Sequence, residues 1–104
     1  MRMVDAAVAE LVGVLLDART ALSLPTNDFA WSAWEGAEDA LREVDGLIAT
    51  LRAGALPRRL DLEVLFVVTG PIQEVSLSSG WAKTFLALAS RFDAAVAKLY
   101  GPER

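Results

Sequence analysis

Residues 34–51 read WEGAEDALREVDGLIATL, and this stretch decides the fold class. Its apolar side chains recur three and four residues apart over nearly three heptads, at Trp34, Ala37, Leu41, Val44, Ile48 and Leu51. That spacing places them on one side of an α-helix. Acidic residues come early in the stretch and Arg52 follows it, as the helix dipole favours. The stretch therefore predicts a helix with one buried face.

Two further segments repeat this spacing, one on each side of the central one. We call such a row of apolar side chains on one helix face a seam. The seam of residues 4–22 consists of Val4, Val8, Leu11, Leu15, Ala18 and Leu22. The seam of residues 81–99 consists of Trp81, Phe85, Leu88, Phe92, Ala95 and Leu99. Pro25 ends the first segment, and Gly54 with Pro57 ends the central one. We therefore expect three helices of comparable length, with short loops at these breaks.

The segment between them, residues 62–75, reads LEVLFVVTGPIQEV and is ambiguous. Its β-branched and aromatic residues suit a strand, but no other segment offers that strand a partner. An apolar seam at Leu62, Leu65, Val68, Ile72 and Val75 continues across Gly70-Pro71. We expect a third helix that is kinked or broken at Gly70-Pro71, the alternative being two short helices with Pro71 at the first position of the second. The chain is thus predicted to be all-α, a single domain over residues 1–104 that folds as an antiparallel four-helix bundle.

Composition excludes several kinds of chemistry. The chain has 104 residues with no cysteine and no histidine, so disulfides, thiolate nucleophiles, cysteine zinc sites and histidine bases are absent. Its seven glycines are too far apart to form a glycine-rich phosphate loop. Catalysis would depend on carboxylates, lysine, tyrosine or hydroxyl groups.

Charge and hydropathy also restrict the partners. The net charge is −4 and the ten basic residues are scattered, so we expect no nucleic-acid partner. The longest apolar runs are too short to span a bilayer, and the start MRMVDAAVAE lacks the apolar stretch of a signal peptide. We expect a cytoplasmic protein with no membrane partner, and the Ala, Leu, Val and Arg bias is compatible with a bacterium of high GC content.

The region around the predicted break is the best candidate for a binding surface. A proline inside a helix frees a carbonyl, and such breaks occur where bundles bind other molecules. The polar candidates beside the break are Thr69, Gln73, Glu74 and Ser76. In the alternative interpretation, Thr69 caps a restarted helix and Glu74 lies in its first turn, with no role in binding.

Two tryptophans complete the candidate surface. Trp81 opens the last seam, where it either contributes to binding or is a core aromatic whose indole N–H bonds a carbonyl at the bundle end. Trp31 lies at the edge of the second seam, and a partly exposed tryptophan is a common interface anchor.

Carboxylates crowd the second predicted helix. Glu35 lies three residues before Glu38 and four before Asp39, so either pair could share a Mg²⁺ or Mn²⁺ ion on a helix. This Glu-x-x-Glu-Asp spacing resembles half of the metal site in the all-helical nucleotide pyrophosphohydrolases of the MazG type. The resemblance covers five residues and implies a second acidic pair on another helix, which Asp61, Glu63 and Glu74 do not supply. A solvated acidic face is the other interpretation.

The first predicted helix has more apolar surface than one seam needs. Val8, Val12 and Leu16 form a neighbouring row, which either a homodimer or a wide contact within the core would cover. Our first functional hypothesis is therefore a non-enzymatic interaction or regulatory module that forms a homodimer or binds another protein, without a cofactor. The second is a divalent-metal bundle that binds or hydrolyses nucleotides through the acidic residues of its second helix.

Overall fold

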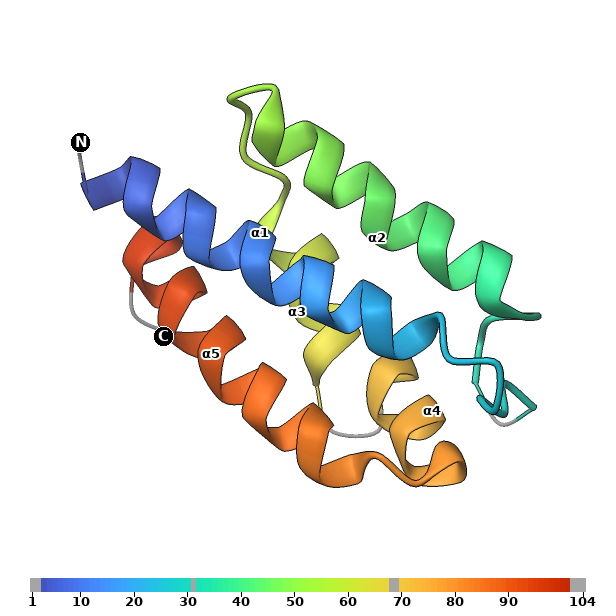
Figure 1. The fold of residues 1–104 in the computed structure, drawn as a ribbon. Helices are drawn as coiled ribbons and strands as arrows, with labels where there is room; N and C mark the ends of the chain where they lie inside the picture. Colours follow the sequence, from blue (N-terminus) through green and yellow to red (C-terminus); the bar gives the residue numbers. More distant parts are fainter. Residues whose placement is uncertain (1–2, 31, 68–69, 102–104) are drawn as a thin grey trace.

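The fold was analysed in a computed structural model that describes residues 3–30, 32–67 and 70–101. These residues form helices and loops and contain no strand. Figure 1 shows the helices in chain order, which are α1 (Met3–Leu22), α2 (Ala37–Arg52), α3 (Arg59–Phe66), α4 (Pro71–Ser79) and α5 (Ala82–Tyr100). The predicted all-α, antiparallel four-helix bundle is confirmed, with α3 and α4 together forming its third helix. None of the helices in the described part of the chain is long and apolar enough to cross a membrane.

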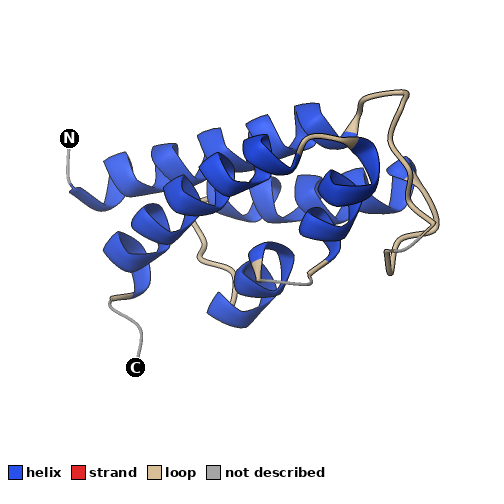
Figure 2. Cartoon of the chain, turned by 90° about the horizontal axis from the view of Figure 1, so that it is seen from below, coloured by secondary structure: helices blue, strands red, loops and turns tan. Residues whose placement is uncertain are grey.

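Helix α1 lies between α2 and α5 and packs against both (Figure 1). In the view from below in Figure 2, one of the two short helices lies beneath the long ones, and both α3 and α4 pack against α5. The buried side of α1 is formed by Ala7, Leu11, Val14, Leu15, Ala18, Ala21 and Leu22. Because α1 has neighbours on two sides, Val8 and Val12 are also partly buried against the core, while Leu16 is exposed. The wide apolar arc is thus largely covered within one chain, and the homodimer stays a prediction.

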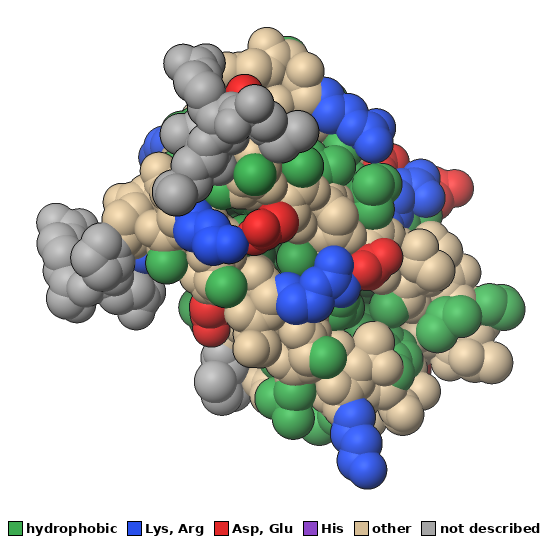
Figure 3. Space-filling view, turned by 60° about the vertical axis from the view of Figure 1, so that its left-hand side comes forward, with side chains coloured by type: hydrophobic (Ala, Val, Ile, Leu, Met, Phe, Trp, Pro, Cys, Tyr) green, Lys and Arg blue, Asp and Glu red, His purple; other side chains and the backbone are tan. Residues whose placement is uncertain are grey.

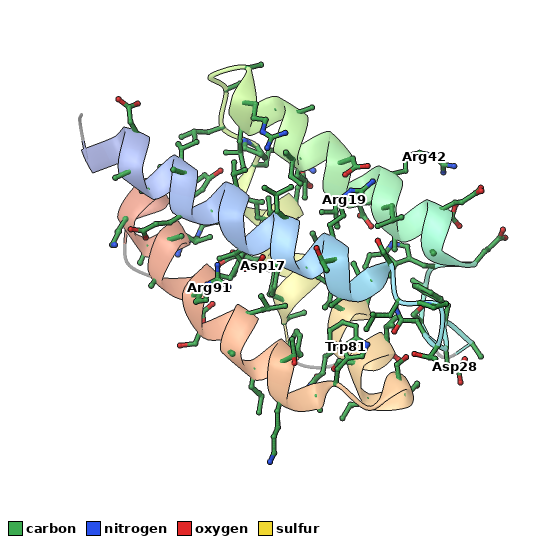
Figure 4. The ribbon with its side chains drawn as sticks, viewed as in Figure 1. Asp17, Arg19, Asp28, Arg42, Trp81 and Arg91 are labelled. Atoms are coloured by element: carbon green, nitrogen blue, oxygen red, sulfur yellow. The ribbon has the colours of Figure 1, made fainter. Side chains whose placement is uncertain are left out.

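Ion pairs fix α1 to its two neighbours. Arg19 Nε lies 2.6 Å from Asp45 Oδ1 on α2, and this hydrogen bond holds the pKa of the Asp45 carboxyl below its ordinary value. On the other side of α1, Arg91 of α5 lies 2.7 Å from Asp17. Figure 3 shows basic and acidic side chains adjoining one another on one face, and Figure 4 shows how Asp17, Arg19 and Arg91 lie. Exposed pairs of this kind contribute little stability, but they favour one register of the helices.

The second helix begins one turn after Trp34, the first residue of the predicted seam, and the loop that joins it to α1 is longer than the short loop expected. The helix starts at Ala37, because Gly36 has an extended backbone (φ −177°, ψ −172°) and the chain is not helical before it. The side chain of Asp39 accepts a 3.2 Å hydrogen bond from the backbone N–H of Glu35, which holds the segment just before the helix. Trp34 is nevertheless buried, and its indole N–H donates to the Glu43 carboxylate at 2.7 Å. The seam predicted the burial of Trp34 correctly, although Trp34 is outside the helix.

The third helix breaks at the predicted place. Val67 ends α3 with an extended backbone, and Pro71 is the first residue of α4 after the extended N-cap Gly70. The alternative with two short helices is therefore the one the structure adopts. A Cβ atom added to Gly70 would lie only 2.8 Å from the carbonyl oxygens of Val64 and Val67. Glycine allows this close approach of the two chain segments.

Aromatic packing joins the short helices to α5. The ring of Phe66 stacks on Phe92 with 4.2 Å between centroids, and it also stacks on Phe85 at 6.4 Å. Leu62 and Leu65 are buried on the same side of α3. Helix α3 is thus fixed to the core by one face only, and Leu60 and Val64 on its other side are exposed.

Candidate functional site

A row of exposed apolar side chains runs along the outer side of α3. Leu60 is 62% exposed, Val64 41% and Val67 48%. Leu60 and Val64 are four residues apart and so lie on one side of the helix, and Val67, directly after the last turn, lines the same groove as both of them. We call these three residues the α3 face. Scattered apolar residues are normal on a protein surface, whereas a contiguous row is typical of an interaction site.

The α3 face lies between two grooves. The first, between α2 and α3, has a volume of about 410 Å³ and is lined by Arg42, Glu43, Gly46, Leu47, Thr50, Pro57, Asp61 and Val64. The second, between α3 and α5, has a volume of about 340 Å³ and is lined by Leu60, Glu63, Val64, Phe66, Val67, Phe92 and Asp93. Val64 lines both grooves, so the α3 face is a ridge with a hollow on each side.

Charged side chains border the ridge. Arg58 pairs with Asp61 at 3.0 Å, and this hydrogen bond lowers the pKa of the Asp61 carboxyl. Arg59 pairs with Glu63 at 3.2 Å on the side of the second groove. Asp93, on the opposite wall of that groove, has no ion pair with another described residue. An apolar centre with a charged rim is the usual anatomy of a protein interface.

The start of α3 is anchored to the end of α5. Arg59 donates a 3.2 Å hydrogen bond to the backbone oxygen of Gly101, and its guanidinium lies 6.0 Å from the centroid of the Tyr100 ring. The Tyr100 hydroxyl donates to the carbonyl oxygen of Pro57. Burial raises the pKa of Tyr100, and the nearby Arg59 charge opposes this rise. The position of the α3 face is thereby fixed from its amino-terminal end.

The candidate binding residues near the helix break differ in how far they are exposed, and they do not form one surface patch. Ser76 is fully buried, and its hydroxyl donates to the carbonyl oxygen of Gln73 at 2.7 Å. Gln73 and Glu74 are partly exposed on α4. Thr69 and Trp31 lie outside the described residues.

Trp81 is a core residue at the end of the bundle. It is 9% exposed, and its indole N–H donates to the side-chain oxygen of Asn27 at 2.8 Å. Next to it, the hydroxyl of Ser79 accepts a 2.9 Å hydrogen bond from the backbone N–H of Asp28. Figure 4 shows Trp81 beside α4, with Asp28 in the loop that approaches it. These bonds hold the loop between α1 and α2 against the turn between α4 and α5.

The three candidate metal ligands do not share a helical face. Glu35 precedes α2, so its spacing to Glu38 and Asp39 is not a helical spacing. The Asp39 carboxylate already bonds the Glu35 N–H and, at 3.2 Å, Arg42. Within residues 3–30, 32–67 and 70–101, no three acidic residues are grouped as a metal site requires.

No protein-family model matches this chain, and no significant similarity to a curated protein or a solved structure was found. Its function therefore has to be inferred from the molecule itself.

Sequence reasoning missed the α3 face. It used one seam of the third helix, at Leu62, Leu65 and Val68, and left the neighbouring row unassigned. That row was visible in the spacing of Leu60, Val64 and Val67. Two adjoining apolar rows on a short helix are a signal that one of them is not needed for the core.

Proposed function

We propose that this protein is a non-enzymatic interaction or regulatory module whose contact surface is the α3 face. The observation that carries the proposal is the ridge of Leu60, Val64 and Val67, about half exposed and bordered by two grooves. Burying a fully exposed Val or Leu side chain contributes about 1.5–3 kcal/mol of free energy. Because these side chains are already about half buried, covering each of them on binding would contribute roughly 1 kcal/mol. A partner that covers the ridge therefore gains affinity from the apolar surface alone.

The chemistry of the surroundings favours binding over catalysis. Four of the charged groups beside the ridge are engaged in pairs, Arg58 with Asp61 and Arg59 with Glu63. A catalytic acid or base usually has a pKa moved toward neutrality, whereas the pKa of Asp61 is moved away from it. Such pairs suit a rim that orients a partner.

The surface proposed here differs in its residues from the one suggested by the sequence. It stays on the broken third helix, but it is on α3 rather than on α4 and Trp81. The cytoplasmic location and the bacterial origin suggested by composition are part of the same proposal, and they stay predictions.

A photoreactive amino acid tests the contact surface in the cells of the native host. Placed at position 60, it should form a covalent adduct with a protein partner on illumination. Position 86 is the matched control, because Leu86 is also 62% exposed but lies on α5, outside the two grooves. The adduct from position 60 should disappear when Val64→Glu places a charge in the ridge. Equal labelling at positions 60 and 86, or no adduct at position 60, would contradict the proposal.

A further inference from the structure

We propose that the partner of the α3 face is a second copy of this chain, bound across a two-fold axis close to Val64. This inference rests on the proposed function, because it names the partner of the same surface. In such a pair the two α3 helices run antiparallel. Val64 of each copy meets Val64 of the other, and Leu60 of each copy lies against Val67 of the other.

The shape of the surface is self-complementary. A two-fold interface uses the same patch on both subunits, so the patch must present both a projection and a hollow that receives it. The α3 face is the projection, and the groove between α3 and α5, with Phe66 and Phe92 among its lining residues, is the hollow beside it. Side-chain ridges of one helix fit into grooves of another in the same manner inside proteins.

The charges of α3 favour the antiparallel arrangement. Both of its basic residues, Arg58 and Arg59, stand at the amino-terminal end, and its last turn contains no basic residue. The carboxyl end of a helix carries a partial negative charge that a nearby cation stabilises. Antiparallel pairing brings the amino-terminal end of each α3, with the largely exposed Arg58, toward the carboxyl end of the other. Each copy thus brings a basic residue toward the carboxyl end of the other's α3, whose last turn has none of its own.

The size of the surface predicts a weak dimer. Helix α3 has eight residues, about 12 Å of helix, in a chain that exposes 6218 Å² in all. A standard interface takes about 20–30 residues from each partner, and the residues that line the two grooves, the α3 face included, are fewer than that. We therefore expect a dissociation constant in the micromolar range, roughly 1–100 µM.

Single-cysteine variants of the full chain test the axis directly, because the natural sequence contains no cysteine. A disulfide forms only where two Cβ atoms come within about 4.5 Å, which for identical positions happens close to the two-fold axis. Under mild oxidation we expect Val64→Cys to form a covalent dimer about tenfold faster or more than Leu86→Cys. Sedimentation equilibrium of the cysteine-free protein provides the second measurement. Leu60→Glu should weaken self-association about a hundredfold, since each dimer contains the change twice, while Leu86→Glu leaves it unchanged.

Either of two results would overturn the inference. One is a protein that stays monomeric at about 1 mM, roughly ten times the weakest dissociation constant expected. The other is a Val64→Cys variant that cross-links no faster than Leu86→Cys, which would mean that any dimer uses another surface. Circular dichroism of Leu60→Glu confirms that the variant is folded. The proposed function and this inference fail on different results. An in-cell adduct between position 60 and a different protein would exclude the second copy as the partner but keep the α3 face as a binding surface. No adduct at position 60 would contradict the proposed function itself.

Discussion

The indole N–H of Trp81 donates a 2.8 Å hydrogen bond to the side-chain oxygen of Asn27, which lies 54 residues earlier in the chain. The side-chain nitrogen of Asn27 donates in turn to the carbonyl oxygen of Ala21, at 2.8 Å, in the last turn of α1. One amide therefore satisfies a nearly buried donor next to α5 and gives a second, shorter hydrogen bond to the Ala21 carbonyl, which also accepts from the Leu24 N–H at 3.3 Å. The loop from α1 to α2 is held against the turn between α4 and α5 by this side chain, together with the bond from the Asp28 N–H to the Ser79 hydroxyl.

Asn27→Leu should destabilise the fold. The change leaves the Trp81 N–H without an acceptor in a largely buried position, which costs about 1–3 kcal/mol. For a domain of this size we expect the melting temperature to fall by roughly 5–20 °C. Asn27→Asp is the control, because it keeps an oxygen for the indole and loses only the bond to Ala21. Urea denaturation followed by tryptophan fluorescence measures both, and equal losses in the two variants would show that the Trp81 bond contributes nothing.

Gly70→Ala should destabilise the protein although it adds a single methyl group. The new Cβ would lie 2.8 Å from the carbonyl oxygens of Val64 and Val67, and these backbone atoms move only if the junction of α3 and α4 shifts. We expect a loss of about 1–3 kcal/mol from overpacking.

Gly46→Ala is the matched control for this change. No heavy atom lies within 4 Å of a Cβ added there, and Gly46 is exposed in the interior of α2. Alanine is the better helix former by about 0.8–1.0 kcal/mol, so this variant should be more stable than the natural protein. Opposite signs in the two denaturation curves are the expected result. A neutral Gly70→Ala would mean that the backbone at the junction adapts freely.

Local sequence patterns predicted most of this fold because they report on helix faces. The seams at Leu11 and Leu15 and at Phe85 and Phe92 are buried as expected, and the break falls at Pro71, which cannot donate a helical hydrogen bond. The start of α2 was placed one turn too early, since Trp34 is buried from outside the helix.

The candidate site was harder to predict because it depends on which helices lie next to which. Periodicity shows which face of a helix carries the apolar side chains, but it does not show whether a neighbouring helix covers that face. Val8 and Val12 of α1 are covered by adjacent helices, whereas Val64 of α3 is not. The bond between Trp81 and Asn27 was equally invisible, because it joins a helix end to a loop far away in the sequence.

Tyr100 is the only tyrosine of the chain, and its titration should therefore be directly readable. Burial favours the neutral phenol and raises its pKa above the ordinary value of 10.0. A raised pKa in the folded state means that the stabilisation is complete below pH 10 and is lost as the pH rises through the folded-state pKa. Absorbance at 295 nm should give a midpoint above pH 10 in the native protein and close to 10 in denaturant.

Arg59→Ala provides the control for this titration. The Arg59 charge lowers the pKa of Tyr100, so its removal should move the native midpoint further upward. A downward shift would show that Arg59 acts mainly by keeping Tyr100 buried. Tyr100→Phe should in addition cost about 0.5–1.5 kcal/mol, because it removes the hydrogen bond to the Pro57 carbonyl.

Divalent metal ions should not stabilise this protein. Glu35 lies before the first turn of α2, and the Asp39 carboxylate is engaged by the Glu35 N–H and by Arg42, so a metal ion would have to break both bonds. A ligand at 100 times its dissociation constant adds about 2.7 kcal/mol, which would raise the melting temperature by roughly 10 °C or more. We expect no such rise with Mg²⁺ or Mn²⁺, with or without nucleotides.

A rise of that size that is lost in Glu35→Ala and in Glu38→Ala would instead identify a metal site. Asp39→Asn belongs in the same series rather than Asp39→Ala, because asparagine keeps the oxygen that accepts the Glu35 N–H and so separates loss of metal binding from loss of that hydrogen bond.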